Sequence, residues 1–166
     1  MSVLTPPARA IDPRGQRFGA GVSAVILGVA IASGAFWLAA LVGLNLLIAA
    51  AFGTRFFLPG RPWRALKVVL ALRPAEPEHE YPPRFAQALG GTFVALAGAM
   101  YLAGVSPLAW LLVAAVAALQ TLLAVTGYCL GCRLYFLRWL VPSILARVFG
   151  RVDRLEGLRI EPLRRV

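Results

Sequence analysis

The sequence predicts an all-α, polytopic membrane protein with four transmembrane helices, and three features of the 166-residue chain lead to this prediction. Hydrophobic residues form 60% of the chain and charged residues only 14%, whereas charged residues make up about a quarter of an ordinary soluble domain. Two long stretches, residues 18–54 and 85–132, contain no acidic or basic residue. The formal net charge is +10. These features exclude a soluble enzyme, a disordered tail and a nucleic-acid-binding domain with a polar basic surface.

Each uncharged stretch is long enough for two membrane crossings, because one crossing of a hydrocarbon core about 30 Å thick takes roughly 20 helical residues. Turn-forming residues divide both stretches: Ser33-Gly34 in the first, and the sequence GVSP at 104–107 in the second. Pro107 suits the first turn of a new helix. We therefore predict spans at residues 18–33, 36–52, 85–102 and 108–128, which form two helical hairpins in tandem.

The basic residues predict the orientation. They precede the first span, separate the second from the third, and follow the fourth, whereas the two short turns contain none. All 17 Lys and Arg residues therefore lie on one side of the bilayer, which the positive-inside rule makes cytoplasmic for both termini. This topology accounts for the basic excess without a nucleic acid partner. The opposite rim carries an expected aromatic belt of Phe36, Trp37, Tyr101 and Trp110.

The remaining segments are expected at the cytoplasmic surface. Residues 62–73 are too short to span and carry Trp63, Leu66 and Val69 on one face, which predicts an interfacial helix. Residues 134–149 are apolar but interrupted by basic residues and a proline, so we predict a surface helix. Residues 1–150 then form a single domain, followed by a basic cytoplasmic tail at 151–166. The N-terminal sequence MSVLTPPARAID does not resemble a cleaved signal peptide.

The two hairpins resemble each other weakly. Each begins at an Arg-Phe pair, Arg17-Phe18 or Arg84-Phe85, and each ends at a glycine, Gly53 or Gly127. A parallel repeat and coincidence explain this pattern equally well. Asn45 and Gln120 lie at similar depth before the two glycines, and both are expected to form interhelical hydrogen bonds rather than to bind substrate. Rows of small residues in the spans indicate close packing within the bundle, or association into a homo-oligomer.

The chemistry of the chain is concentrated at residues 127–133, Gly-Tyr-Cys-Leu-Gly-Cys-Arg, which contain both cysteines. A Cys-x-x-Cys pair in a reducing compartment indicates redox or metal chemistry before a structural disulfide. Cys129 and Cys132 would share one face of the fourth helix, and Gly127 and Gly131 would supply local backbone freedom or close packing.

The expected position of the pair, at the C-terminal end of the fourth span, creates an electrostatic difficulty. The helix dipole at this end disfavours a thiolate, so a reactive pair needs nearby cations. Arg133 is adjacent in sequence, and Arg17 and Arg84 enter the membrane on the same side. We hypothesise that these three arginines surround the dithiol, and that Gln87 and Tyr128 line the same pocket.

Other readings of the cysteines remain open. They can pack as small apolar residues in a structural or accessory subunit. They can also hold a metal, but zinc takes four ligands and one chain offers two thiols plus His79 in a loop, so a metal site needs an oligomer; we expect no cofactor. The spans contain no Asp, Glu, Lys or Arg, which argues against a proton-driven transporter with a carboxylate relay.

Three runs of residues, 11–18, 82–87 and 127–132, together resemble the bacterial membrane family catalogued as domain of unknown function 4395. The Gly-aromatic-Cys-aliphatic-Gly-Cys run is the most specific of them, although Tyr128 stands where many members have Phe. The resemblance covers roughly residues 9–140. It implies a bacterial inner membrane location and, through the frequent link of members with thioredoxin-like and sulfurtransferase proteins, a role in thiol or sulfur chemistry.

The first hypothesis is therefore a cytoplasm-facing dithiol protein that exchanges electrons or sulfur with a thioredoxin-like or rhodanese-like partner. Two alternatives remain: a structural subunit of an oligomer or larger membrane complex, and a small conduit for a soft metal or sulfur species. Quinone-coupled disulfide enzymes fit less well, because their sites work on the outer face with additional cysteines.

Overall fold

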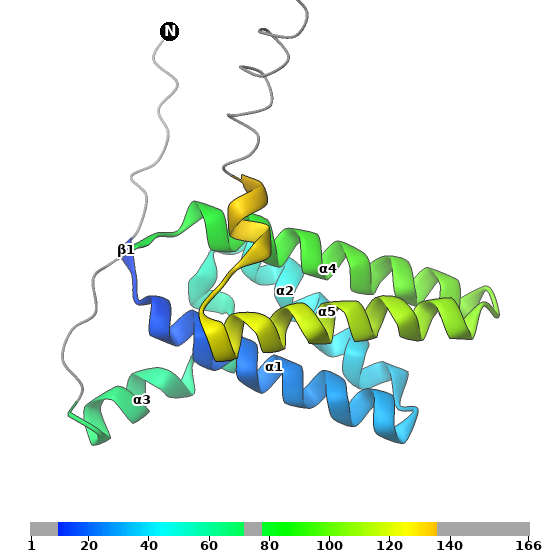
Figure 1. Ribbon diagram of the computed structural model, residues 1–166, viewed down its shortest axis with the longest axis horizontal. Coiled ribbons are helices and arrows are strands. Elements are labelled where there is room, and N and C mark those ends of the chain that lie inside the picture. Colours follow the sequence, from blue (N-terminus) through cyan, green and yellow to red (C-terminus); the bar gives the residue numbers. More distant parts are fainter. Residues whose placement is uncertain (1–9, 72–77, 136–166) are drawn as a thin grey trace, which may run out of the picture.

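Four apolar helices lie side by side and form the body of the molecule (Figure 1). The structure, a computed structural model, describes residues 10–71 and 78–135. The helices are α1 (Pro13–Ser33), α2 (Phe36–Phe52), α4 (Tyr81–Leu102) and α5 (Ser106–Thr126). Three of them, α1, α4 and α5, are long and apolar enough to cross a membrane, and α2 is a shorter apolar helix.

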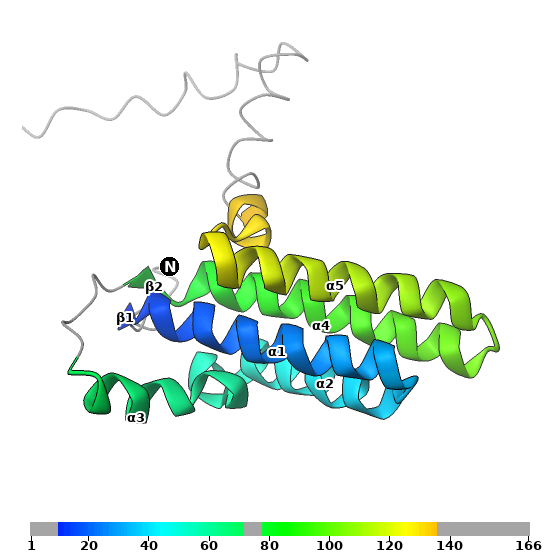
Figure 2. The same ribbon diagram turned by 60° about the horizontal axis from the view of Figure 1, so that its bottom comes forward.

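The helix boundaries follow the sequence closely at one end of the bundle. α1 turns into α2 at Gly34 and α4 turns into α5 at Gly104, and both glycines have positive φ, +68° and +82°. We call this the turn end (Figure 2). The ring of Phe36 stacks on Tyr101 at 4.3 Å and meets Trp110 edge-on at 5.5 Å. Three of the four predicted belt residues thus form one aromatic cluster, while the fourth, Trp37, is exposed.

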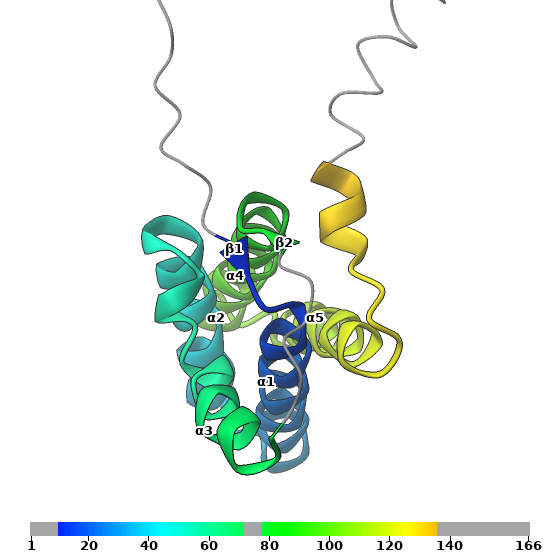
Figure 3. The same cartoon turned by 90° about the vertical axis from the view of Figure 1, so that its left-hand side faces the viewer.

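Each helix packs chiefly against a helix of the other hairpin. α1 lies along α5 and α2 lies along α4, whereas α1 and α4 occupy opposite corners of the bundle (Figure 3). The side chains of Leu27, Leu46 and Val113 are fully buried at its centre. Close approach of α2 and α4 depends on Gly91, where a Cβ atom would lie 2.7 Å from the Leu47 Cγ atom.

The opposite end, which carries both cysteines, is called the cysteine end. Short elements link the two hairpins here: η1 (Thr54–Phe56), η2 (Leu58–Gly60), α3 (Pro62–Val69), and the antiparallel strands β1 (Ala10–Ile11) and β2 (Glu78–His79). The Asn45 amide fixes this linker, since its Nδ2 donates to Phe56 O and its Oδ1 accepts from Leu58 N, each at 3.2 Å. Asn45 therefore binds the short turns η1 and η2 of the linker rather than another helix of the bundle, contrary to the sequence prediction.

Several predicted boundaries need adjustment. The helix predicted at 62–73 ends at Val69, and its Trp63 ring lies 5.7 Å from Phe18 of α1. α1 and α4 begin several residues before the predicted spans, because prolines occupy their first turns and suit a helix start. Of the predicted surface helix, residues 134 and 135 are helical and 136–149 lie outside the described residues, as does the predicted tail at 151–166.

The Asp12 carboxylate joins the start of α1 to α3. It accepts hydrogen bonds from the Arg14 backbone N–H at 3.0 Å, from Trp63 Nε1 at 3.4 Å and from Lys67 Nζ at 3.0 Å. Partial burial by itself raises the pKa of Asp12, but the hydrogen bonds and the charge of Lys67 outweigh burial and hold the pKa below its ordinary value.

We expect acid to weaken this junction. Because the pKa of Asp12 is lower in the folded chain, its contribution to the free energy of unfolding is present above the ordinary aspartate pKa and is lost as the pH falls through the lowered pKa. The contribution is at most about 1 kcal/mol, since Asp12 and Lys67 are both partly exposed. Thermal unfolding in detergent, followed from neutral to acidic pH, should lose more stability in the wild type than in Asp12→Asn. Identical pH profiles would contradict the assignment.

Candidate functional site

The site begins where α5 ends. Gly127 adopts φ +74°, and its N–H donates to Leu123 O at 2.9 Å, which closes the helix after Thr126. The Thr126 Oγ1 then accepts a hydrogen bond from Tyr128 N at 3.0 Å. The chain turns away from α5, and residues 130–135 form a new helical stretch across the cysteine end (Figure 1). We call residues 127–135 the cysteine segment.

The two cysteines form a disulfide at the start of this new helical stretch. Their Cα atoms are 5.2 Å apart, and both residues are half-buried. The Cys132 backbone N–H donates to Cys129 Sγ at 3.1 Å, and the Arg133 N–H donates to Cys129 O at 3.1 Å. Cys129 thus occupies the N-cap position, where a side chain accepts a hydrogen bond from the first turn.

The sequence prediction placed the cysteines at the C-terminal end of a helix, and this was wrong. The left-handed conformation of Gly127 ends α5 before the motif, so backbone N–H groups rather than carbonyl groups face the Cys129 sulfur. N–H groups at a helix start favour negative charge. The electrostatic difficulty that required surrounding arginines is therefore absent at Cys129.

The cysteine segment is docked on the first turns of α4. A Cβ atom at Gly131 would lie 2.6 Å from the Ala86 Cβ and 2.9 Å from the Ala86 Cα. One turn away, the rings of Phe85 and Tyr135 are 5.8 Å apart. Only glycine at position 131 allows this approach, so the predicted packing role of Gly131 has a specific partner.

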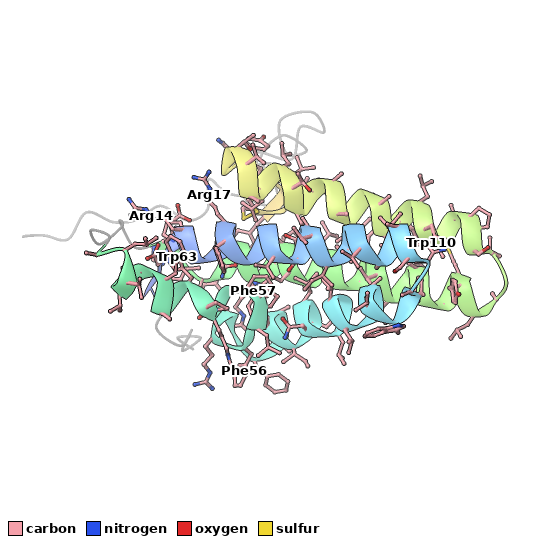
Figure 4. All side chains as sticks on the ribbon, turned by 90° about the horizontal axis from the view of Figure 1, so that it is seen from below. Arg14, Arg17, Phe56, Phe57, Trp63 and Trp110 are labelled. Carbon is pink, nitrogen blue, oxygen red and sulfur yellow. A yellow bond between two sulfur atoms is a disulfide. The ribbon has the colours of Figure 1, made fainter. Side chains whose placement is uncertain are left out.

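Arg17 and Arg84 bind the carbonyl groups that end two helices. Arg84 Nε and Nη2 donate to Ala50 O and Ala51 O of α2, at 2.9 and 2.7 Å. Arg17 Nη2 donates to the carbonyls of residues 124 and 125 of α5, at 3.4 and 3.1 Å. Figure 4 shows Arg17 at the cysteine end, far from Trp110 at the turn end. A role of the two arginines in stabilising a thiolate remains a prediction, but both guanidinium groups have an evident structural role.

A cavity of about 320 Å³ lies behind the disulfide, between α1, α4, α5 and the cysteine segment. It is bordered by most of the predicted site residues, namely Arg17, Gln87, Gln120, Gly127, Cys129, Gly131 and Cys132. Tyr128 and Arg133 are not part of this lining, and the Arg133 guanidinium lies 5.5 Å from the Tyr128 ring centre. Arg84 is also outside it. The structure therefore joins the cysteines with Arg17, Gln87 and Gln120 around one space.

Gln87 is the polar residue buried at this cavity, with 7% of its surface exposed. Its Nε2 donates to Gln16 Oε1 at 3.3 Å, while its Oε1 has no hydrogen-bond partner. Sequence reasoning did not select Gln16, although its place one turn into α1 and next to Arg17 was a usable signal. Among the described residues, no three His, Cys, Asp or Glu side chains gather as metal ligands, and His79 lies in β2.

Comparison with known proteins identifies one relationship. The family described as "Domain of unknown function (DUF4395)" matches residues 11–139, which include all four helices and the cysteine segment. No curated protein and no solved structure matches the chain.

Proposed function

The chain belongs to this family of unknown function. From that premise we propose that it is a membrane-embedded dithiol protein. Its Cys129 and Cys132 exchange electrons with a thioredoxin-like partner, or sulfur with a rhodanese-like partner, in the cytoplasm. The observation that carries the proposal is the disulfide at the start of a helical stretch, with Cys129 Sγ accepting the Cys132 N–H. A structural disulfide would have no need of this position, whereas a nucleophilic thiolate is favoured by it.

The proposed exchange proceeds through a mixed disulfide. In the reduced protein, the Cys129 thiolate attacks one sulfur of the partner's disulfide, and the partner's other sulfur leaves as a thiolate and takes up a proton. The Cys132 thiol then loses its proton and attacks Cys129 Sγ, which releases the partner's second sulfur as a thiolate that also takes up a proton. The partner gains two electrons and two protons, and the Cys129–Cys132 disulfide is formed. The same steps in reverse reduce this protein.

The location of the site supports a cytoplasmic partner. We place all four helices across the bilayer as two hairpins with the cysteine end inside. The described basic residues lie at or beyond the ends of the helices on that side, among them Arg14, Arg55, Lys67 and Arg133, and the turn end has none. With 17 residues, α2 is about 26 Å long, and η1 adds to it before the chain leaves the bundle.

Single cysteine variants test the exchange reaction. Cys132→Ser keeps the proposed nucleophile and should accumulate a mixed disulfide with an oxidised bacterial thioredoxin, seen on a non-reducing gel. Cys129→Ser keeps a thiol without the N-cap hydrogen bond and should accumulate at least about tenfold less. The wild type should show a defined dithiol–disulfide midpoint in a redox titration with thiol trapping.

The same preparation distinguishes the alternatives. Thiols that neither oxidise nor react in the folded protein would support a structural or accessory subunit and contradict the proposal. Zinc or iron bound at one ion per two chains, found by elemental analysis, would replace it with a metal site shared by a dimer.

A further inference from the structure

The cavity beside the disulfide is deep and largely apolar. Thiol-disulfide exchange with a soluble partner does not require such a cavity. From Cys129 and Cys132 it runs into the apolar layer past Leu119 to Ala115 of α5, and as far as Phe93 of α4. Phe93 and Leu119 are also partly exposed, with 40% and 42% of their surface accessible. Because these two lining side chains are accessible, the ligand is expected to enter between them, from the surface that the proposed arrangement turns toward lipid.

The dimensions and lining limit the class of ligand. About 320 Å³ is near the lower end of the roughly 300–1,000 Å³ typical of ligand pockets, which suits one ring system rather than a whole phospholipid. Apart from Gln16, Arg17, Glu78, Gln87 and Gln120, the lining away from the cysteines is made of apolar side chains, proline and glycine. A ring-sized, largely apolar molecule with a few polar atoms fits this composition.

Gln87 adds a polar requirement. Its Nε2 is engaged by Gln16, so the free atom at this position is the buried acceptor Oε1. A buried acceptor without a partner destabilises the protein, and a ligand that offers an O–H group would remove this cost. The ligand should therefore carry a hydroxyl group in at least one of its chemical states.

The neighbouring cysteines add a chemical requirement. A dithiol that closes to a disulfide gives up two electrons and two protons. A ligand held beside the two sulfurs can oxidise them if it accepts the two electrons and the two protons. We propose that the cavity binds a membrane-soluble quinone, which has an apolar ring, takes up two electrons and two protons, and carries two hydroxyl groups once reduced. This inference rests on the proposed function, because it names the electron acceptor of the same pair of cysteines.

In the proposed step, the Cys129 and Cys132 sulfurs lose their protons and join in a disulfide, and the quinone receives the two electrons and two protons. Its two carbonyl oxygens become hydroxyls, one of which donates to Gln87 Oε1. The dithiol of the cytoplasmic partner then reduces the disulfide by exchange. The partner thus takes the place of the second cysteine pair that outward-facing quinone-coupled bundles carry, and the proposed site differs from those bundles in working on the cytoplasmic side.

The test uses the full chain in detergent, reduced, freed of reductant and kept without oxygen. The probe is decylubiquinone, whose fully substituted ring leaves no position to which a thiol can add. We expect one quinone reduced per protein, followed by its ultraviolet absorbance, with the loss of two thiols per chain. Exchange with thioredoxin is measured on the same samples.

Two glycines of α4 provide matched variants. Gly90 lines the cavity, and a Cβ there meets Leu46 and Val116 only at 3.5 and 3.9 Å, so Gly90→Leu should fill the space without breaking the helix contacts. It should slow quinone reduction at least about tenfold and leave exchange with thioredoxin intact. Gly98 is half-buried near the turn end and does not line the cavity, so Gly98→Leu should behave as the wild type.

Gln87→Leu tests the acceptor separately. Binding is measured with a Cys129→Ser/Cys132→Ser protein, which cannot react, so that this measurement does not depend on the thiols. We expect quinol affinity to fall about tenfold and quinone affinity to change little, because only the quinol offers an O–H group to Oε1.

Each outcome of these measurements supports or overturns either the quinone inference or the proposed function. Normal exchange with thioredoxin but no reduction of decylubiquinone overturns the quinone inference and leaves the proposed function standing. Equal slowing by Gly90→Leu and Gly98→Leu, or equal loss of quinol and quinone affinity in Gln87→Leu, also overturns it. Quinol binding by the serine protein without any exchange in the wild type would instead refute the proposed function and retain the binding site.

Discussion

Replacing Gly131 by alanine is expected to detach the cysteine segment from α4 and to reduce dithiol exchange at least about tenfold. The added Cβ would lie 2.6 Å from the Ala86 Cβ and 2.9 Å from its Cα, and a helix backbone cannot move aside as a flexible side chain can. Overpacking of this kind costs about 1–3 kcal/mol, which shifts a docking equilibrium by roughly five- to 150-fold. Because Cys132 follows Gly131 directly, the disulfide and one wall of the cavity would move together.

The measurements are the rate of exchange with thioredoxin and the rate at which a bulky maleimide reaches the reduced cysteines. Exchange should fall while alkylation rises. Gly28→Ala is the control, because nothing lies within 4 Å of the added Cβ and alanine favours helix. Adding Ala86→Gly to Gly131→Ala should restore part of the exchange rate, since it removes the closer of the two clashing atoms. If Gly131→Ala and Gly28→Ala behave alike, the segment is not held by this contact.

The helices themselves were largely predictable, for a simple physical reason. A charged side chain is costly in an apolar layer, so the stretches without charged residues show where the helices lie. A tight reversal of the chain needs a glycine or a polar residue, so such residues show where one helix ends and the next begins. α2 begins and ends at the predicted residues, and both turns lie at the predicted glycines. The starts of α1 and α4 were placed too late because Arg17 and Arg84 were taken as the limits of the spans. Their guanidinium groups instead reach helix carbonyls, so the helices begin before them.

The cysteine segment could not be predicted from its own residues. The sequence identifies Gly127 as the end of the second hairpin, but a glycine between apolar residues is also compatible with a continuing helix, and its neighbours in sequence do not dictate its φ of +74°. The conformation is decided by tertiary contacts, since the Arg17 side chain lies against Gly127 and Ala86 lies against Gly131, and both partners are far away in sequence. The cavity has the same origin, because it depends on how the segment closes over α1, α4 and α5.

The weak repeat gains support from the contacts of the two arginines. Arg84, at the start of the second hairpin, binds the carbonyls three and two residues before Gly53. Arg17, at the start of the first, binds the carbonyls three and two residues before Gly127. Each hairpin thus caps the last turn of the other in the same register. A parallel repeat would produce this shared register. The halves differ afterwards: η1 and η2 follow Gly53, and the cysteines follow Gly127.

Alanine substitution of the two arginines is expected to separate their structural role from any effect on the thiols. Each variant leaves the carbonyl groups at a helix C-terminus without a cationic donor, which lowers the free energy of unfolding. Arg84→Ala should cost about 2 kcal/mol and Arg17→Ala about 1 kcal/mol, because the Arg84 bonds are shorter and its side chain is half-buried whereas Arg17 is exposed. Thermal unfolding in detergent measures both values.

The alkylation rate of the reduced cysteines then distinguishes the two residues. Arg17 lies against Gly127, 3.2 Å from Cζ to the position of a Cβ, and lines the cavity beside the disulfide, so Arg17→Ala should change the rate several-fold. Arg84 caps α2 and does not line the cavity, so Arg84→Ala should leave the alkylation rate unchanged once the folded fractions are equal.

The variant Arg84→Lys keeps the charge but cannot bind both carbonyls at once, so it should recover only part of the stability. An equal effect of both alanine variants on alkylation would contradict this division and favour a ring of arginines around the dithiol. Their capping bonds would then be secondary to an electrostatic field that both guanidinium groups share.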